Sequence, residues 1–159
     1  MRTATNTAQE TEGFGWRLAR ARPAEDNALI VLYLTGELGA GKTTFARGFL
    51  RALGVSGPVR SPTYTLMELY PAGALTLLHV DLYRLRDPAE LEALGLREWA
   101  RAGHVWLIEW PEKGGGHLPP ADLTLSFAVA ASAHDIEVTP HSALGRHWLV
   151  QLTGGERHA

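Results

Sequence analysis

Apolar positions along the chain form continuous runs in some segments and follow a helical period in others. The run ALIVLYL at 28–34 has no charged residue and is rich in β-forming types, which is typical of a strand buried on both faces of a sheet. The segment HVWLIEW at 104–110 has the same apolar character. Segments 63–70 and 74–81 predict two further strands, joined by a short Pro-Ala-Gly turn.

Helical patterns lie between these strands. Residues 8–22 place apolar side chains on one side and predict a first helix. A second helix is predicted to begin at Thr43 and to end at Gly54, a common C-terminal stop. The segment DPAE at 87–90 has the capping residues of a helix start, and this helix is predicted to continue to about Ala102.

The last third of the chain changes to a period of two, which predicts half-exposed, antiparallel strands that act as scaffold. The alternating apolar residues fall in three groups: Leu123, Leu125 and Phe127; Ile136 and Val138; and Trp148, Val150 and Leu152.

Composition narrows the class of protein. The 159 residues fit one domain spanning 1–159, with a core large enough to fold by itself, and the 45% hydrophobic and 20% charged content is typical of a globular protein. The net charge of −2 gives no electrostatic reason to bind nucleic acid over a broad face. Any nucleic acid is therefore expected to be held mostly by another subunit.

Several kinds of site are excluded or disfavoured. The chain has no cysteine, so disulfides and thiolate metal sites are excluded, and its seven histidines show no short metal-ligand spacing. The apolar run at 28–34 is far shorter than the roughly 20 residues that span a bilayer, and no export signal follows Met1. We expect a cytoplasmic protein.

The segment GELGAGKT at 36–43 matches the phosphate-binding pattern G-x-x-x-x-G-K-[ST]. Glycines allow the backbone N–H groups to point at phosphate oxygens, and the helix that follows adds its positive N-terminal end. Lys42 can reach the β- and γ-phosphates, and the Thr43 hydroxyl can bind Mg²⁺. A chance glycine turn is the alternative, but the buried strand before the motif and the amphipathic helix after it favour a nucleotide site. The fold expected from this unit is a three-layer α/β P-loop NTPase-like domain, with a mostly parallel central sheet and added antiparallel strands.

A second acidic group is needed near the Mg²⁺ ion, and two residues qualify. Asp81 ends one apolar run and Glu109 ends another, so both are expected at the carboxyl ends of strands, where open α/β sheets bind ligands. The pattern does not choose between them without the strand order, and either residue could also be a solvated acid. The loop SPTYT at 61–65 is either a switch-like γ-phosphate sensor or only the entry to a strand.

Together these motifs resemble the bacterial TsaE (YjeE) ATPases of tRNA threonylcarbamoyladenosine synthesis. The resemblance runs from about Thr11 to Pro119, with the P-loop, SPTYTLMELY, HVDLYRL and IEWPEKG in the family's order and spacing. The P-loop alone is common, but its combination with the other three segments is highly specific.

The resemblance implies roles for individual residues. Thr43 and Glu109 would bind Mg²⁺, Asp81 would act near the γ-phosphate together with Lys42, and Thr11 would lie against the adenine. The residues implied in phosphate binding are Glu37, Leu38, Gly39, Ala40, Gly41, Lys42, Thr43 and Thr44. Ser61, Thr63 and Tyr64 would form the switch-like loop, while Tyr83, Arg84 and Trp110 match motif positions without an assigned role.

The resemblance also implies partners. TsaE-like proteins act with the subunits TsaB and TsaD, and TsaD transfers the threonylcarbamoyl group to tRNA. The TsaE-like member hydrolyses ATP to reset the complex. Its hydrolysis is expected to be slow without partners, because a well-placed arginine speeds phosphoryl transfer and Arg84 is the only candidate for this role in the motifs.

Two rival functions stay open. A small-molecule P-loop kinase would carry an arginine-bearing lid, but Arg146 and Arg157 lie in strand-like or terminal sequence. A non-hydrolysing, nucleotide-gated binding module would differ only in whether Asp81 or Glu109 acts chemically.

Overall fold

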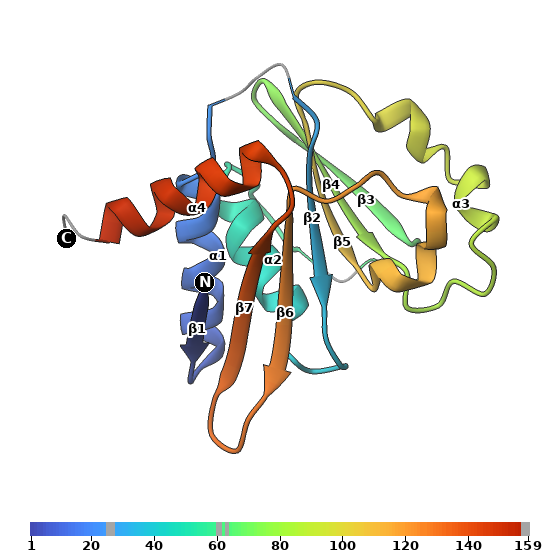
Figure 1. The fold of residues 1–159 in the computed structure, drawn as a ribbon. Coiled ribbons are helices and arrows are strands. Elements are labelled where there is room, and N and C mark those ends of the chain that lie inside the picture. Colours follow the sequence, from blue (N-terminus) through green and yellow to red (C-terminus); the bar gives the residue numbers. More distant parts are fainter. Residues whose placement is uncertain (25–27, 60–61, 63, 157–159) are drawn as a thin grey trace.

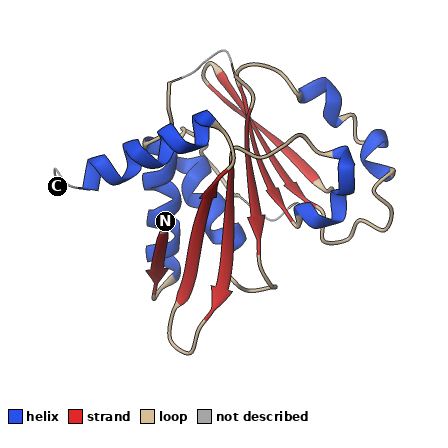
Figure 2. Cartoon of the chain, viewed as in Figure 1, coloured by secondary structure: helices blue, strands red, loops and turns tan. Residues whose placement is uncertain are grey.

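A seven-stranded sheet forms the centre of the structure, a computed structural model that describes residues 1–24, 28–59, 62 and 64–156 (Figures 1 and 2). The strands are β1 (Arg2–Thr5), β2 (Ile30–Thr35), β3 (Met67–Ala72), β4 (Leu75–Asp81), β5 (His104–Glu109), β6 (Leu123–Val129) and β7 (His134–Pro140). The α-helices are α1 (Ala8–Arg20), α2 (Lys42–Ala52), α3 (Glu90–Ala93) and α4 (Ala143–Glu156), and two 3-10 segments span Leu96–Trp99 and Pro111–His117.

The strand order is β1-β7-β6-β2-β5-β4-β3. The four inner strands β6, β2, β5 and β4 run parallel to one another, whereas β3, β7 and β1 are added in antiparallel pairing at the two sides. The predicted α/β class with a mostly parallel sheet and added antiparallel strands is confirmed. Strand β5 lies between β2 and β4, which is the order that the sequence left open.

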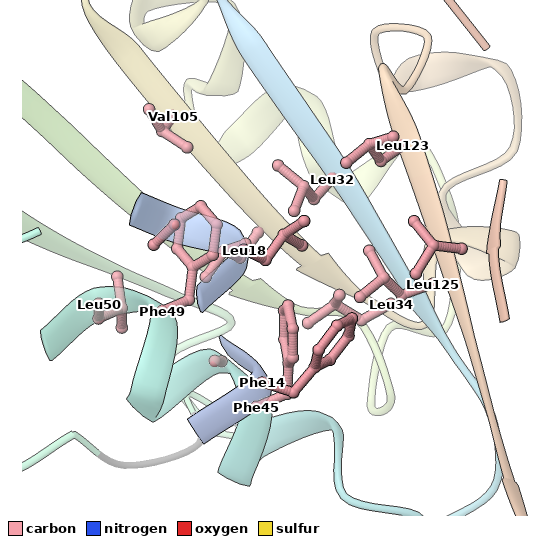
Figure 3. Close-up of a cluster of buried hydrophobic side chains, with 14 of the residues drawn as sticks. Phe14, Leu18, Leu32, Leu34, Phe45, Phe49, Leu50, Val105, Leu123 and Leu125 are labelled. Atoms are coloured by element: carbon pink, nitrogen blue, oxygen red, sulfur yellow. The ribbon is translucent and has the colours of Figure 1, made fainter. Parts of the chain in front are cut away.

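Alternate residues of the inner strands supply two cores, one on each face of the sheet. Leu32 and Leu34 of β2 pack with α1, α2 and α4, whereas Val31 belongs to a second cluster under the 3-10 segments and α3. Figure 1 shows α1, α2 and α4 on one side of the sheet and α3 on the other, so the sheet is the middle layer of a three-layer α/β fold. Figure 3 shows the larger core, in which Phe45 contacts Phe14 with ring centroids 5.8 Å apart.

Helices α1 and α2 approach closely because each has a glycine that faces the backbone of the other helix. A Cβ added at Gly15 would lie 2.2 Å from the carbonyl oxygen of Phe45, and one added at Gly48 would lie 1.9 Å from that of Glu12. No side chain fits at either position without moving a helix. This packing fixes the N-terminal part of α1 beside the loop that precedes α2.

The prediction of a strand around Trp148 is wrong, because residues 143–156 form helix α4. Trp148 and Leu152 are buried one helical turn apart, while Val150 between them is 66% exposed. Ser142 begins the helix: its Oγ accepts a hydrogen bond from the Gly145 amide at 2.9 Å, as a helix cap does. Arg146 therefore lies on a helix, and Arg157 lies outside the described residues.

Smaller differences concern the ends of elements. Strand β3 begins at Met67 rather than 63, after Leu66 with a left-handed φ of 64°, and it continues through Pro71 and Ala72 to a turn at 73–74. The helix predicted from 87–90 to Ala102 is broken at Gly95, although its capping box forms: the Asp87 amide donates to Glu90 Oε1 at 3.0 Å.

Two further points complete the fold. Strand β1, which pairs with β7 at one edge of the sheet, was not predicted from the sequence. Within the described ranges, no helix combines the length and the apolarity needed to span a bilayer.

Candidate functional site

The loop between β2 and α2 turns tightly over the carboxyl end of β2. Gly36, Gly39 and Gly41 have φ values of 136°, 78° and 104°, which side-chain-bearing residues rarely adopt. A Cβ at Gly36 would also lie 2.4 Å from the backbone oxygen of Phe127. The glycine spacing of the motif is therefore required by the backbone path, and the loop ends directly at the N-terminus of α2, where anions bind favourably.

Lys42 is the first residue of α2, and its ammonium is directed back into this loop. The side chain is 4% exposed, and Nζ donates to the carbonyl oxygens of Gly36 and Glu37, the latter at 2.8 Å. Nζ also lies 4.5 Å from the ring centroid of Trp110. Burial lowers the pKa of the Lys42 ammonium, while the carboxylates of Glu109, Asp81 and Glu112, in that order, act in the opposite direction.

Glu109 is the acid that contacts the motif. Thr43 Oγ1 donates to its carboxylate, at 3.1 Å from Oε1 and 3.2 Å from Oε2. Nε2 of the fully buried His79 also contacts this carboxylate, 2.7 Å from Oε2. Because β5 is the direct neighbour of β2, its last residue emerges beside the loop, which explains the contact with Thr43.

Asp81 lies one strand further from the loop, and it pairs with Glu109 across β4 and β5. It is 4% exposed, and its Oδ1 accepts a hydrogen bond from the Tyr83 amide at 2.9 Å. Both carboxylates therefore lie on the same face of the sheet, but it is Glu109 that contacts the P-loop threonine. Strand order distinguishes two residues that were equivalent in the sequence.

A cavity of about 680 Å³ joins these groups. In the strand order, β2, which leads into the loop, and β5, which ends in Glu109, lie between β4, which ends in Asp81, and β1, which leads into α1. The lining residues are Thr5, Asn6, Thr7, Ala8, Thr11, Leu38, Gly39, Gly41, Lys42, Thr43, Thr44, Asp81, Tyr83, Arg84, Glu109, Trp110 and His134. This volume is ample for a small-molecule ligand.

Most of the predicted site residues are brought together in this cavity. The exceptions are Glu37, whose carbonyl oxygen contacts Lys42, and Ala40, a buried residue of the loop itself. Of the predicted switch-like loop, Ser61 and Thr63 lie outside the described residues. Tyr64 is 84% exposed, does not line the cavity, and has the guanidinium of Arg84 4.6 Å from its ring centroid.

Tyr83 and Trp110 close the cavity near the acids. Their ring centroids are 5.1 Å apart, and Lys113 Nζ donates to the backbone oxygen of Tyr83 at 2.9 Å. Trp110 has a left-handed φ of 59°, unusual for a bulky residue, and its indole lies over the Lys42 ammonium. Of the motif positions without an assigned role, Trp110 therefore forms an aromatic wall against the P-loop lysine, and Tyr83 packs against Trp110.

Thr11 lies in the cavity wall, with its hydroxyl directed to the protein. Its Oγ1 lies 2.7 Å from that of Thr5 and donates to the Thr7 carbonyl at 3.2 Å. Its methyl group is the part that approaches the loop, 3.4 Å from a Cβ position at Gly41. Thr11 can therefore offer a ligand an apolar contact while its hydroxyl fixes the segment between β1 and α1.

Apart from Thr11, sequence reasoning missed the cavity residues of the segment from β1 to α1, and it also missed His134. A signal for Thr7 was present in the sequence, because Thr7 and Glu10 have the spacing of a capping box. In the structure the Glu10 amide donates to Thr7 Oγ1 at 3.1 Å. The Asn6 amide in turn donates to Glu10 Oε2 at 2.7 Å. His134 had no comparable signal, because it comes from a hairpin far along the chain.

The residues present fit a nucleotide with Mg²⁺. Within the described part of the chain, no group of three or more His, Asp or Glu could enclose a metal ion. A threonine hydroxyl beside one carboxylate suits Mg²⁺, which keeps water and phosphate oxygens as most of its ligands. The glycine loop supplies the space in which phosphates can approach the backbone.

Comparisons with known proteins agree with one another. Residues 5–136 match the family model "Threonylcarbamoyl adenosine biosynthesis protein TsaE". The tRNA threonylcarbamoyladenosine biosynthesis protein TsaE of Haemophilus influenzae is 47% identical over 118 residues, which are 74% of this chain and 75% of that protein. The protein of the same name from Bacillus subtilis is 38% identical over 128 residues, 80% of this chain and 78% of that protein.

A solved structure shares the fold. The crystal structure of YdiB of Bacillus subtilis superposes with a TM-score of 0.79 at 28% sequence identity, covering 98% of this chain and 95% of that one.

Proposed function

The chain belongs to the TsaE family of threonylcarbamoyl adenosine biosynthesis proteins, and from this premise we propose that it binds and hydrolyses ATP in that process. The family places the chain in tRNA threonylcarbamoyladenosine biosynthesis. The single observation that carries the ATP proposal is the contact of Thr43, at the start of α2, with Glu109 beneath a glycine loop that also holds the Lys42 ammonium.

Binding would use groups that are already in place. The triphosphate would take the Lys42 ammonium from the carbonyl oxygens of Gly36 and Glu37, because a phosphate oxygen is a stronger acceptor for a cation than a carbonyl is. The amides of the loop would donate to the same phosphates. Thr43 and Glu109 would hold Mg²⁺, which when bound neutralises charge on the β- and γ-phosphates.

Hydrolysis would use the end of the cavity where Asp81 lies. A water molecule would attack the γ-phosphorus and the bond to the β–γ bridging oxygen would break, giving ADP and phosphate. Asp81 would orient this water and accept its proton. Its Oδ1 already accepts the Tyr83 amide, which fixes the carboxylate for that role.

The isolated protein is expected to turn over slowly. Arg84 is the one arginine among the described residues that line the cavity, and its guanidinium stacks on the exposed ring of Tyr64. A well-placed arginine can contribute about 10³–10⁵ in phosphoryl-transfer rate. We propose that TsaB and TsaD complete the site in a cytoplasmic complex that holds the tRNA, and that ATP hydrolysis resets this complex between turnovers.

Phosphate release tests this function. The wild-type protein is assayed alone, with TsaB, with TsaD and with both, and the Lys42→Ala variant in the same mixtures measures contaminating ATPase. We expect a low rate alone and an increase of at least about tenfold with both partners. Equal rates with and without partners would contradict the partner-dependent function. ADP formation without phosphate release, in the presence of an acceptor, would indicate a kinase instead.

A further inference from the structure

We propose that His134 is a nucleotide-binding residue, whose Nδ1 contacts the ribose of ATP. The proposal rests on the proposed function, because it concerns the same cavity. His134 comes from β7, about 90 residues after the P-loop motif, and is part of neither that motif nor the acidic pair.

The backbone of His134 is held from both sides. It pairs with Val129 of β6 on one side and with Thr5 of β1 on the other, at the end of the β6–β7 hairpin. Its side chain lies on the same face of the strand as those of Ile136 and Val138, which belong to the core beneath α1 and α2. The imidazole is therefore directed to the side of the sheet on which the P-loop lies.

The position of Nδ1 points to a ligand. It lies 3.2 Å from the Cβ position of Gly41, so it stands directly against the P-loop, and His134 lines the cavity. Among the described residues, three buried side-chain nitrogens have no hydrogen-bond partner: Arg22 Nε, His79 Nδ1 and His134 Nδ1. Of these three residues, only His134 lines the cavity. A buried polar atom without a partner requires an explanation, and a bound ligand supplies one.

Strand order decides which part of the ligand His134 would meet. Strand β7 lies on the β6 side of β2, whereas the strands that carry Asp81 and Glu109 lie on the other side. The γ-phosphate and Mg²⁺ belong with the two acids, so His134 faces the opposite half of the ligand. There the cavity wall consists of Thr11 and the segment 5–8, which suits a nucleoside.

The test compares ligands with and without the nucleoside. The affinities of ATP, ADP and inorganic tripolyphosphate are measured by competition for wild type, His134→Ala, His134→Asn and His134→Gln. Asparagine places a polar atom where Nδ1 lies, whereas glutamine places one near Nε2. His147→Ala, an exposed histidine of α4, is the matched control.

We expect His134→Ala to weaken ATP and ADP about tenfold and to leave tripolyphosphate unchanged. Asparagine should restore binding to within about threefold of wild type, and glutamine should not. In wild type, the ¹⁵N NMR signal of His134 Nδ1 should move on adding ADP but not on adding tripolyphosphate.

Three results would overturn the proposal: unchanged ATP affinity in His134→Ala, equal weakening of ATP and tripolyphosphate, or an Nδ1 signal that ADP does not move. The first and third would leave the ATPase function intact. If wild type bound neither ATP nor tripolyphosphate, the proposed function itself would fail and this assignment with it.

Discussion

Gly15 lies where helices α1 and α2 touch, and its substitution by alanine tests the packing on which the site depends. The new Cβ would lie 2.2 Å from the carbonyl oxygen of Phe45 and 2.9 Å from the amide nitrogen of Phe49. Both are backbone atoms of α2, so no change of rotamer relieves the overlap. The helices must move apart, and with them Thr11 and the P-loop.

The size of the effect follows from two opposing terms. Overpacking a well-packed core costs about 1–3 kcal/mol, and overlap with two rigid backbone atoms puts Gly15→Ala at the upper end. Replacing glycine by alanine inside a helix returns about 0.5–1 kcal/mol. The net loss is about 2 kcal/mol, which for a protein of this size lowers Tm by about 4–8 °C.

Gly13→Ala is the matched control, because it makes the same chemical change two residues away in the same helix. Gly13 is exposed, and an added Cβ there meets nothing within 4 Å. It should therefore raise stability by about 0.5–1 kcal/mol and Tm by about 1–4 °C. Thermal and urea unfolding followed by circular dichroism measure both variants. Shifts of Tm in the same direction would refute the reasoning from the helix contact.

Two further predictions separate the acids. Glu109→Ala removes the partner of Thr43 and should raise the Mg²⁺ concentration needed for half-maximal turnover about tenfold or more, as titration of activity with MgCl₂ measures. Asp81→Ala should lower the hydrolysis rate at least about a hundredfold while changing ATP affinity less than about threefold, as single-turnover and binding assays measure; the reverse pattern would exchange the roles of the two residues.

The P-loop could be predicted from the sequence because its determinants are local. The left-handed glycines, the apolar run of β2 and the amphipathic α2 all lie within 28–54, and each was visible as a residue pattern. The choice between Asp81 and Glu109 could not be made in the same way. It depends on β5 lying between β2 and β4, a property of the whole sheet.

The other misses have similar causes. Trp148, Val150 and Leu152 alternate in sequence, but two buried residues four apart suit a helix equally well, and the helix cap at Ser142 was a signal that the prediction overlooked. His134 reaches the cavity only because β7 is paired between β6 and β1. Contacts that arise from strand pairing over long sequence separations cannot be recognised from the local periodicity of the sequence.

Lys42 and the glycine loop are proposed to hold the triphosphate, and calorimetric titration of Mg·ATP into wild type and Lys42→Ala measures this directly. We expect one ATP bound per wild-type chain and no detectable binding by the variant, with both proteins equally folded by circular dichroism. Equal affinity for the two proteins would contradict it.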